Sequence, residues 1–259
     1  MKRGSLEMDI NMENAKEEFI KYTENYDLTD ENLDGKQKHS LRVMQISEEI
    51  ARDLKLNQEE IKLAALIGLL HDIARFEQYT KYKTFRDLDS IDHGDYGAKI
   101  LKKEIRKYVE LPQYDEIIIK AVKNHNKYKM EDGLSEKEEL FAKIIRDADK
   151  IDILFEAVEM FWKGKEEIVE NSTITEDVIK QFNQNNLIKR RKKERPENSI
   201  NKIITVIAFI FDLNFDISLK YVQENNYIDI LVDRIEYKND DTKQKMEDIR
   251  KCAKEYIKK

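Results

Sequence analysis

The sequence has 259 residues, 39% of them charged, and a formal net charge of -6, whereas proteins that bind nucleic acid in general usually carry a basic excess. Its longest apolar runs, residues 63–70 and 203–211, are much shorter than the roughly 20 residues that span a bilayer, and no secretory signal is visible. The only cysteine, Cys252, has no partner for an internal disulfide, which indicates a reducing compartment. From these features we expect a soluble cytoplasmic protein that does not bind a membrane and does not have nucleic acid as its ligand.

Helix-breaking residues are scarce, with two prolines and seven glycines in the whole chain, and an all-α protein is therefore expected. Residues 1–14 show no sustained periodicity and are interpreted as disordered or derived from an expression vector. A first helix is predicted over Ala15 to Tyr26.

From Gly35 onward the pattern becomes sharply helical. Apolar residues recur at steps of three and four, namely Val43, Ile46, Ile50 and Leu54. His39 lies four residues before the first of them, on the same stripe. The pattern therefore predicts that His39 faces the core.

The next predicted helix has a capping box and an apolar surface on all sides. Asn57 has the position of an N-cap with Glu60 three residues later, and residues 63–70 are continuously apolar. This helix leads into His71 and Asp72, which places two polar residues at the end of a buried element. Gly68, one turn earlier, would allow a neighbouring backbone to come close.

Two further helices carry a histidine at one end. Residues 76–89 are aromatic and charged without a clear period and are predicted to form a loop or a short irregular helix over the site. Ser90 or Asp92 then starts a helix with His93 on its inward face. Another helix begins around Pro112 and has His125 at the end of its apolar stripe.

A fifth helix places Asp149 on a core face, one turn after Ile145 and one turn before Ile153. A hinge is expected around residues 163–165. Beyond it, helices are predicted at residues 175–182, 199–213, 217–233 with a break at Asn225, and 240–257. This part contains no histidine, so chemistry is not expected to originate there. Its basic run, residues 189–195, is interpreted as a solvated helix end or linker, with contact to nucleic-acid phosphates as the alternative.

All four histidines of the chain thus lie on predicted inward faces, together with two aspartates. One such histidine is usually an ordinary core residue, but burying this many polar groups without compensation would be costly, and a metal centre would compensate them. Imidazole and carboxylate ligands without thiolate favour Fe, Mn, Co, Ni or Zn, with Mg as a further option. Six ligands exceed the need of one ion and indicate a bridged pair of divalent ions.

The order His39, His71-Asp72, Asp149 resembles the H…HD…D signature of the HD superfamily of metal-dependent phosphohydrolases. The added His93 and His125 are similar to the longer pattern of its two-metal branches, and local segments agree: His71-Asp72-Ile73-Ala74-Arg75, His93-Gly94-Asp95-Tyr96-Gly97-Ala98 and Asp149-Lys150-Ile151. The resemblance covers Lys36 to Leu154. It implies an HD-type helical bundle over residues 15–162, with residues 163–259 as additional C-terminal helices packed on or beside it.

The resemblance also implies residue roles. His39, His71, Asp72 and Asp149 would hold one metal ion, and Asp72, His93 and His125 the other, with Asp72 as the bridge. Asp72 and Arg75 are the expected catalytic residues, and a phosphate would meet Arg75 and, more weakly, Lys123, Arg146 and Lys150, although each of the last three is more readily interpreted as solvated. Asp147 and Asp152 fall on other helix faces and are not expected to be ligands.

Departures from the family pattern bear on the substrate. No second histidine adjoins His125 and no GYP segment occurs, which argues against cyclic-dinucleotide phosphodiesterases, while Ala74 replaces the glycine usual in diadenosine tetraphosphate hydrolases. The expected function is hydrolysis of a phosphomonoester or phosphodiester bond of a small phosphorylated substrate, preferably a nucleotide, by metal-activated hydroxide. The alternative is a catalytically silent metal-binding sensor or interaction module. A homo-oligomer is compatible with either.

Overall fold

Helices make up all the regular secondary structure that the computed structural model describes, which covers residues 10–159, 170–189 and 200–258. The predicted all-α class is confirmed. The chain divides into two compact units, Met1–Ala148 and Asp149–Lys259. This division falls inside a single helix, α7 (Glu136–Glu159), whereas the predicted boundary at 162/163 lies outside the described residues.

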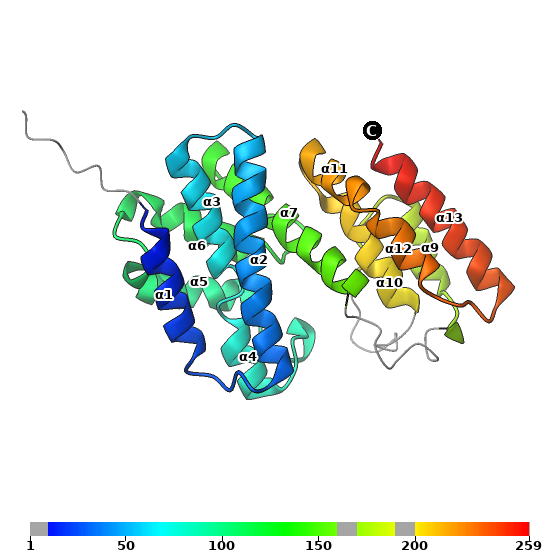
Figure 1. Cartoon of the computed structure of the whole chain (residues 1–259), viewed down its shortest axis with the longest axis horizontal. Helices are drawn as coiled ribbons and strands as arrows, with labels where there is room; N and C mark the ends of the chain where they lie inside the picture. Colours follow the sequence, from blue (N-terminus) through cyan, green and yellow to red (C-terminus); the bar gives the residue numbers. More distant parts are fainter. Residues whose placement is uncertain (1–9, 160–169, 190–199, 259) are drawn as a thin grey trace, which may run out of the picture. The chain divides into compact units, whose positions relative to one another are not determined.

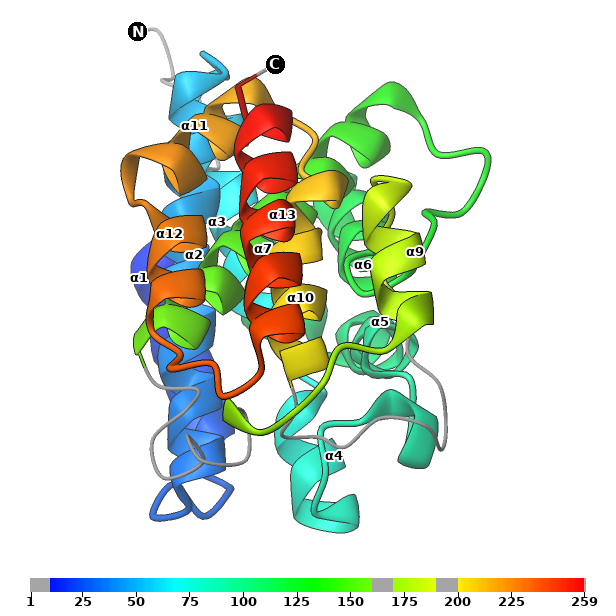
Figure 2. The ribbon, with the colours of Figure 1, turned by 90° about the vertical axis from the view of Figure 1, so that its right-hand side faces the viewer.

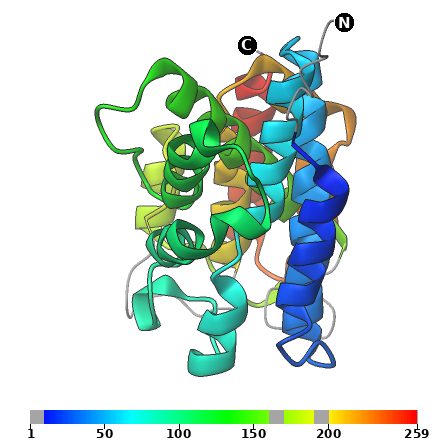
Figure 3. The same cartoon turned by 90° about the vertical axis from the view of Figure 1, so that its left-hand side faces the viewer.

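The first unit consists of helices arranged around one core (Figures 1 and 3). They are α1 (Met12–Thr23), α2 (Glu31–Asp53), α3 (Gln58–Leu70), α4 (Arg75–Tyr82), η1 (Asp87–Asp89), α5 (His93–Glu104), η2 (Ile105–Lys107), η3 (Pro112–Tyr114), α6 (Asp115–Asn124) and the first half of α7. The central helix is α3, which packs against α1, α2 and α6, while α5 packs against α6. Its position explains why residues 63–70 are apolar on every side.

Gly68 allows α2 and α3 to approach each other closely. A Cβ atom at this position would lie 2.8 Å from the carbonyl oxygen of Val43 and 2.8 Å from the Cα atom of Met44, so any larger residue would push the two backbones apart. The predicted close approach is therefore confirmed, and it occurs one turn before the end of α3.

Helix starts follow the capping residues that the sequence indicates. The Asn57 side chain accepts a hydrogen bond from the Glu60 amide, and Glu60 accepts one from the Asn57 amide, as predicted for a capping box. Asp92 caps α5. The N-terminal prediction is wrong in part, because α1 begins at Met12 and Ile10 is buried, so residues 10–14 are ordered.

A regular helix, α4, occupies half of the segment predicted to be a loop or an irregular helix. Only Phe76 and Gln78 of α4 are buried, which explains why the sequence shows no apolar stripe there. Lys83 ends the helix in a left-handed conformation, with φ of 53°, and the chain returns through η1 to α5.

The second unit contains the remaining helices (Figure 2). They are the second half of α7, α9 (Glu176–Asn183), α10 (Ile200–Ile207), η4 (Ala208–Asp212), α11 (Asp216–Glu224), α12 (Tyr227–Asp233) and α13 (Asp240–Tyr256). Asn226, with φ of 53°, separates α11 from α12 next to the predicted break, and α12 packs along α13. The predicted hinge at residues 163–165 and the basic residues 190–195 lie outside the described residues.

Candidate metal centre

Five of the six predicted ligands come together inside the first unit. His39 lies within α2, His71 and Asp72 directly follow α3, His93 is the first residue of α5, and His125 directly follows α6. All five are buried, with at most 4% of each residue exposed. The interior of one helix and the ends of three others thus bring polar side chains to one point of the core, as the apolar stripes predict.

Asp72 lies between two pairs of histidines. Its Oδ2 atom is 3.5 Å from His39 Nε2 and 3.6 Å from His71 Nε2, while its Oδ1 atom is 3.4 Å from His93 Nε2 and 3.5 Å from His125 Nε2. Each pair forms a compact three-ligand group with Asp72. One carboxylate therefore belongs to both groups, through a different oxygen in each.

Hydrogen bonds on the far side of three imidazole rings determine which nitrogen carries the proton. His71 Nδ1 lies 2.7 Å from the Gly68 carbonyl oxygen, His125 Nδ1 lies 2.6 Å from that of Val122, and His93 Nδ1 lies 2.6 Å from Asp87 Oδ2. Carbonyls and carboxylates only accept, so each Nδ1 donates. In the neutral rings, Nε2 then presents a lone pair to the centre.

The His93 half of the centre concentrates lone pairs without a proton to share. The Nε2 atoms of His93 and His125 are only 3.0 Å apart. Burial, followed by the positive charge of Arg75, lowers the pKa of His93 to about 3, so its ring is neutral near pH 7. Two imidazole lone pairs and Asp72 Oδ1 thus converge, an arrangement that a divalent cation would satisfy.

Lys36 is a contact of the centre that the sequence did not reveal. Its Nζ atom lies 2.9 Å from Asp72 Oδ2 and 5.6 Å from the centroid of the Phe85 ring. Burial alone would raise the pKa of Asp72, but nearby positive charge, led by Lys36, holds it well below its usual range. The only signal available was the spacing, because Lys36 precedes His39 by three residues and so shares its helix face.

Arg75 is fixed beside the centre by four hydrogen bonds. Its Nε atom donates to Asp72 Oδ1 at 3.3 Å, and its Nη1 atom donates to Gln78 Oε1, the Phe85 carbonyl and Asp87 Oδ1 at 2.6 to 3.1 Å. Within the part of the chain that the structure describes, Nη2 has no hydrogen-bond partner. Arg75 therefore orients Asp72, and its Nη2 atom is available to donate to a further group.

The other predicted phosphate contacts are engaged within the protein. Lys123 pairs with Glu131, and Arg146 donates to the carbonyl oxygens of Asn124 and Lys127 at 2.8 and 2.7 Å. In the second unit, Lys150 Nζ lies 2.7 Å from Asp212 Oδ2. The interpretation of Arg146 and Lys150 as solvated side chains is wrong, because both residues are buried.

Asp149 belongs to the second unit, on α7, and is partly exposed. Its role as a metal ligand stays a prediction. The neighbouring Asp147 and Asp152 are both buried, with 0% and 1% of each residue exposed.

Residues 37–154, which extend from the first unit into the first six residues of the second, match the HD domain family. The match agrees closely with the range over which the sequence motifs resemble that family, which consists mostly of metal-dependent hydrolases. No curated protein and no solved structure matches the chain.

Among the described residues, no helix has the length and apolar character needed to cross a membrane.

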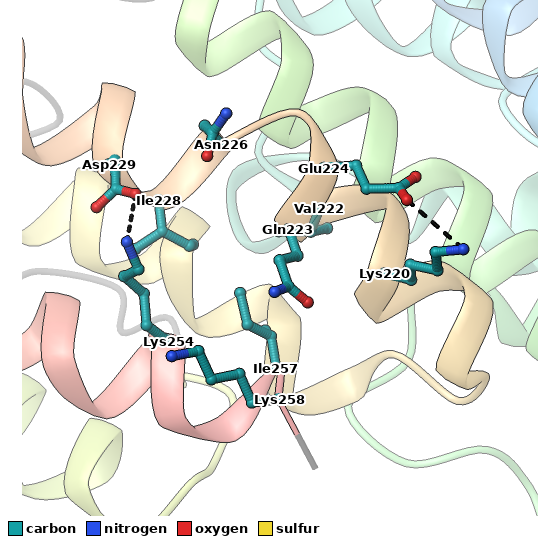
Figure 4. A pocket seen from close by; sticks show the side chains of 10 residues that line it. All are labelled: Lys220, Val222, Gln223, Glu224, Asn226, Ile228, Asp229, Lys254, Ile257 and Lys258. Atoms are coloured by element: carbon teal, nitrogen blue, oxygen red, sulfur yellow. Dashed lines mark hydrogen bonds and ion pairs between the residues drawn. The ribbon is translucent and has the colours of Figure 1, made fainter.

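An open cavity of about 530 Å³ lies in the second unit, between α11, α12 and the end of α13 (Figure 4). None of the predicted ligands lines it. Two of its three lysines are paired, Lys220 with Glu224 and Lys254 with Asp229. The cavity therefore contains none of the imidazole groups that converge at the histidine centre.

Proposed function

We propose that the chain is a phosphohydrolase that uses two divalent metal ions to cleave a phosphoester bond of a small substrate. A nucleotide is the substrate class that we favour. The observation that carries this proposal is the convergence of His93 Nε2, His125 Nε2 and Asp72 Oδ1, which are three acceptors when each neutral ring carries its proton on Nδ1. A divalent cation would compensate such a group, because it accepts lone pairs from both rings and from the carboxylate oxygen.

The ligand sets of the two ions follow from the two oxygens of Asp72. His39, His71 and Asp72 Oδ2 would hold one ion, with Asp149 as a further predicted ligand, and His93, His125 and Asp72 Oδ1 would hold the other. Imidazole and carboxylate donors suit Mn, Fe, Co, Ni or Zn, with Mg as a further option. When bound, the ions would supply Lewis acidity for water activation and for the charge on a phosphoryl oxygen.

The chain itself supplies positive charge beside this centre. Lys36 Nζ and the Arg75 guanidinium carbon lie 5.6 and 5.7 Å from the centroid of the same Phe85 ring, so both cations border one small region. Arg75 Nη2 and Lys36 Nζ are therefore the proposed phosphate contacts, because both residues contact Asp72 of the centre. Lys123 and Lys150 instead pair with carboxylates, and Arg146 donates to backbone carbonyls.

The test is an activity screen on protein of known metal content. Phosphomonoesters, phosphodiesters and dinucleoside polyphosphates would be incubated with the protein and Mn, Fe, Co, Ni, Zn or Mg. We expect metal-stimulated release of phosphate or nucleotide from at least one class, and loss of both metal and activity in Asp72→Ala. Inactivity towards all three classes in protein that holds metal would instead favour the metal-binding sensor or interaction module.

A further inference from the structure

Asp87 collects hydrogen bonds from four residues next to the centre. Its Oδ2 atom accepts from His93 Nδ1 at 2.6 Å and from Asn126 Nδ2 at 3.0 Å. Its Oδ1 atom accepts from Gln78 Nε2 at 2.9 Å and from Arg75 Nη1 at 3.1 Å. These donors come from α4, from the start of α5 and from the chain that follows α6, so the carboxylate connects three segments.

His93 needs this carboxylate because of its place in the chain. His71 and His125 each follow a helix, and their Nδ1 atoms reach the carbonyl oxygen three residues earlier in that same helix. His93 is the first residue of α5, so no preceding turn of its own helix offers a carbonyl. Its anchor comes instead from η1, through Asp87.

The anchor of His93 also carries a negative charge, unlike the carbonyl groups that anchor His71 and His125. A carboxylate bound to the Nδ1 proton makes the imidazole more basic and fixes its orientation more strongly than a carbonyl does. Gln78, which is fully buried, holds the segment that carries Asp87, because its Nε2 atom also donates to Ser90 Oγ and to the Ile91 carbonyl at 2.8 and 3.0 Å. The position of Asp87 is thus determined by the fold before any metal binds.

We infer that Asp87 is the positioning residue for the metal ion held by His93 and His125. The inference rests on the proposed two-metal centre and adds an asymmetry to it. Removal of the carboxylate lowers the affinity for the ion on the His93 side by about 10- to 100-fold, which is the usual effect of losing a hydrogen-bond partner of a metal-binding histidine. The ion on the His39 side keeps its affinity, because Asp87 touches neither His39 nor His71. Arg75, which contacts Asp72, would keep its hydrogen bonds to Gln78 and to the Phe85 carbonyl.

The test is a calorimetric titration of Mn²⁺ into the full metal-free chain, for wild type, Asp87→Ala and the control Asp89→Ala. Asp89 belongs to the same short helix, but its carboxylate pairs with Arg86 and is 43% exposed. We expect two binding events in wild type and in Asp89→Ala. Asp87→Ala should keep the first event and show the second weakened by about 10- to 100-fold.

Two results separate the possible failures. If wild type and Asp87→Ala bind two ions with the same affinities, the role of Asp87 is overturned while the proposed function stands. If wild type binds no metal, the metal centre itself is wrong and the role of Asp87 falls with it.

A measurement on the metal-free wild type does not depend on the folding of a variant. Nitrogen-15 NMR of the imidazole rings should find the proton of His93 on Nδ1, where Asp87 accepts it. A proton on Nε2 of His93 would overturn the inference.

Discussion

The Nε2 atoms of His93 and His125 face each other at 3.0 Å, although the opposite nitrogen of each ring already donates its proton to an acceptor. The two rings therefore cannot hydrogen bond to each other while both are neutral. A cation at their shared edge would satisfy both lone pairs, and Asp72 contributes the negative charge there.

The metal-free protein should lose stability as the pH falls from about 6.5 towards 3. In the unfolded chain His93 takes up a proton below its ordinary pKa of about 6.5, whereas burial lowers its pKa in the folded protein to about 3. The unfolded state binds more protons throughout this window, so the unfolding free energy decreases as the pH falls through it. Urea unfolding of chelator-treated protein at pH 7 and pH 5 measures the decrease.

His93→Gln provides the control for this effect, because its side chain does not titrate. The decrease between pH 7 and pH 5 should be smaller in the variant than in wild type. An equal decrease in both proteins would show that protonation of His93 does not contribute.

Lys36→Gln should impair substrate binding. If the ammonium group contacts a substrate phosphate, its loss removes a charge-assisted hydrogen bond worth about 1.5 to 3 kcal/mol, which raises KM by roughly 10- to 100-fold. Lys38→Gln is the matched control, since Lys38 lies on the same helix, pairs with Asp34 and has a side chain that is 63% exposed. Steady-state kinetics of both variants measure the two KM values. A KM for Lys36→Gln equal to that for Lys38→Gln would rule out the phosphate contact.

Gly68→Ala should destabilise the fold and weaken the centre. The added methyl group would lie 2.8 Å from the Val43 carbonyl oxygen, and overpacking of this kind costs about 1 to 3 kcal/mol. Because His71 follows Gly68 by three residues and is anchored to its carbonyl, we expect metal affinity to fall as well. Thermal unfolding and metal titration report the two effects.

Gly35→Ala, in α2, is expected to have the opposite effect on stability to Gly68→Ala in α3. Apart from the neighbouring residues and the backbone of its own helix, no atom lies within 4 Å of a Cβ atom at Gly35, and alanine in a helix interior is favoured over glycine by about 1 kcal/mol. This variant should be as stable as wild type or more stable. Equal melting temperatures for Gly35→Ala and Gly68→Ala would contradict the close approach of α2 and α3.

Local patterns account for what the sequence predicted well. The capping box at Asn57, the apolar helix before His71 and the inward position of His39 all depend on residues within a few turns of each other. Such spacing places four histidines and Asp72 in the core without knowledge of how the helices pack. The helix α4 was not predicted as a regular helix because it buries too few residues to produce a periodic stripe.

Contacts between distant segments account for what was missed. Asp87 is one of several acidic residues in a polar stretch, and only the folding of η1 against His93 distinguishes it from Asp89. Lys36 is likewise an ordinary helix lysine until α3 brings Asp72 to within 2.9 Å of its amino group. Sequence spacing puts Lys36 on the helix face of His39, but it does not identify Asp72 as its partner, and it gives no sign of the contact between Asp87 and His93.

The most direct measurement of the central claim is a crystal structure of the Mn²⁺-loaded protein with anomalous scattering. We expect two anomalous peaks about 3.5 to 4 Å apart, one beside each oxygen of Asp72, and none in Asp72→Ala. A single peak, or peaks that do not contact Asp72, would contradict a metal pair bridged by this carboxylate.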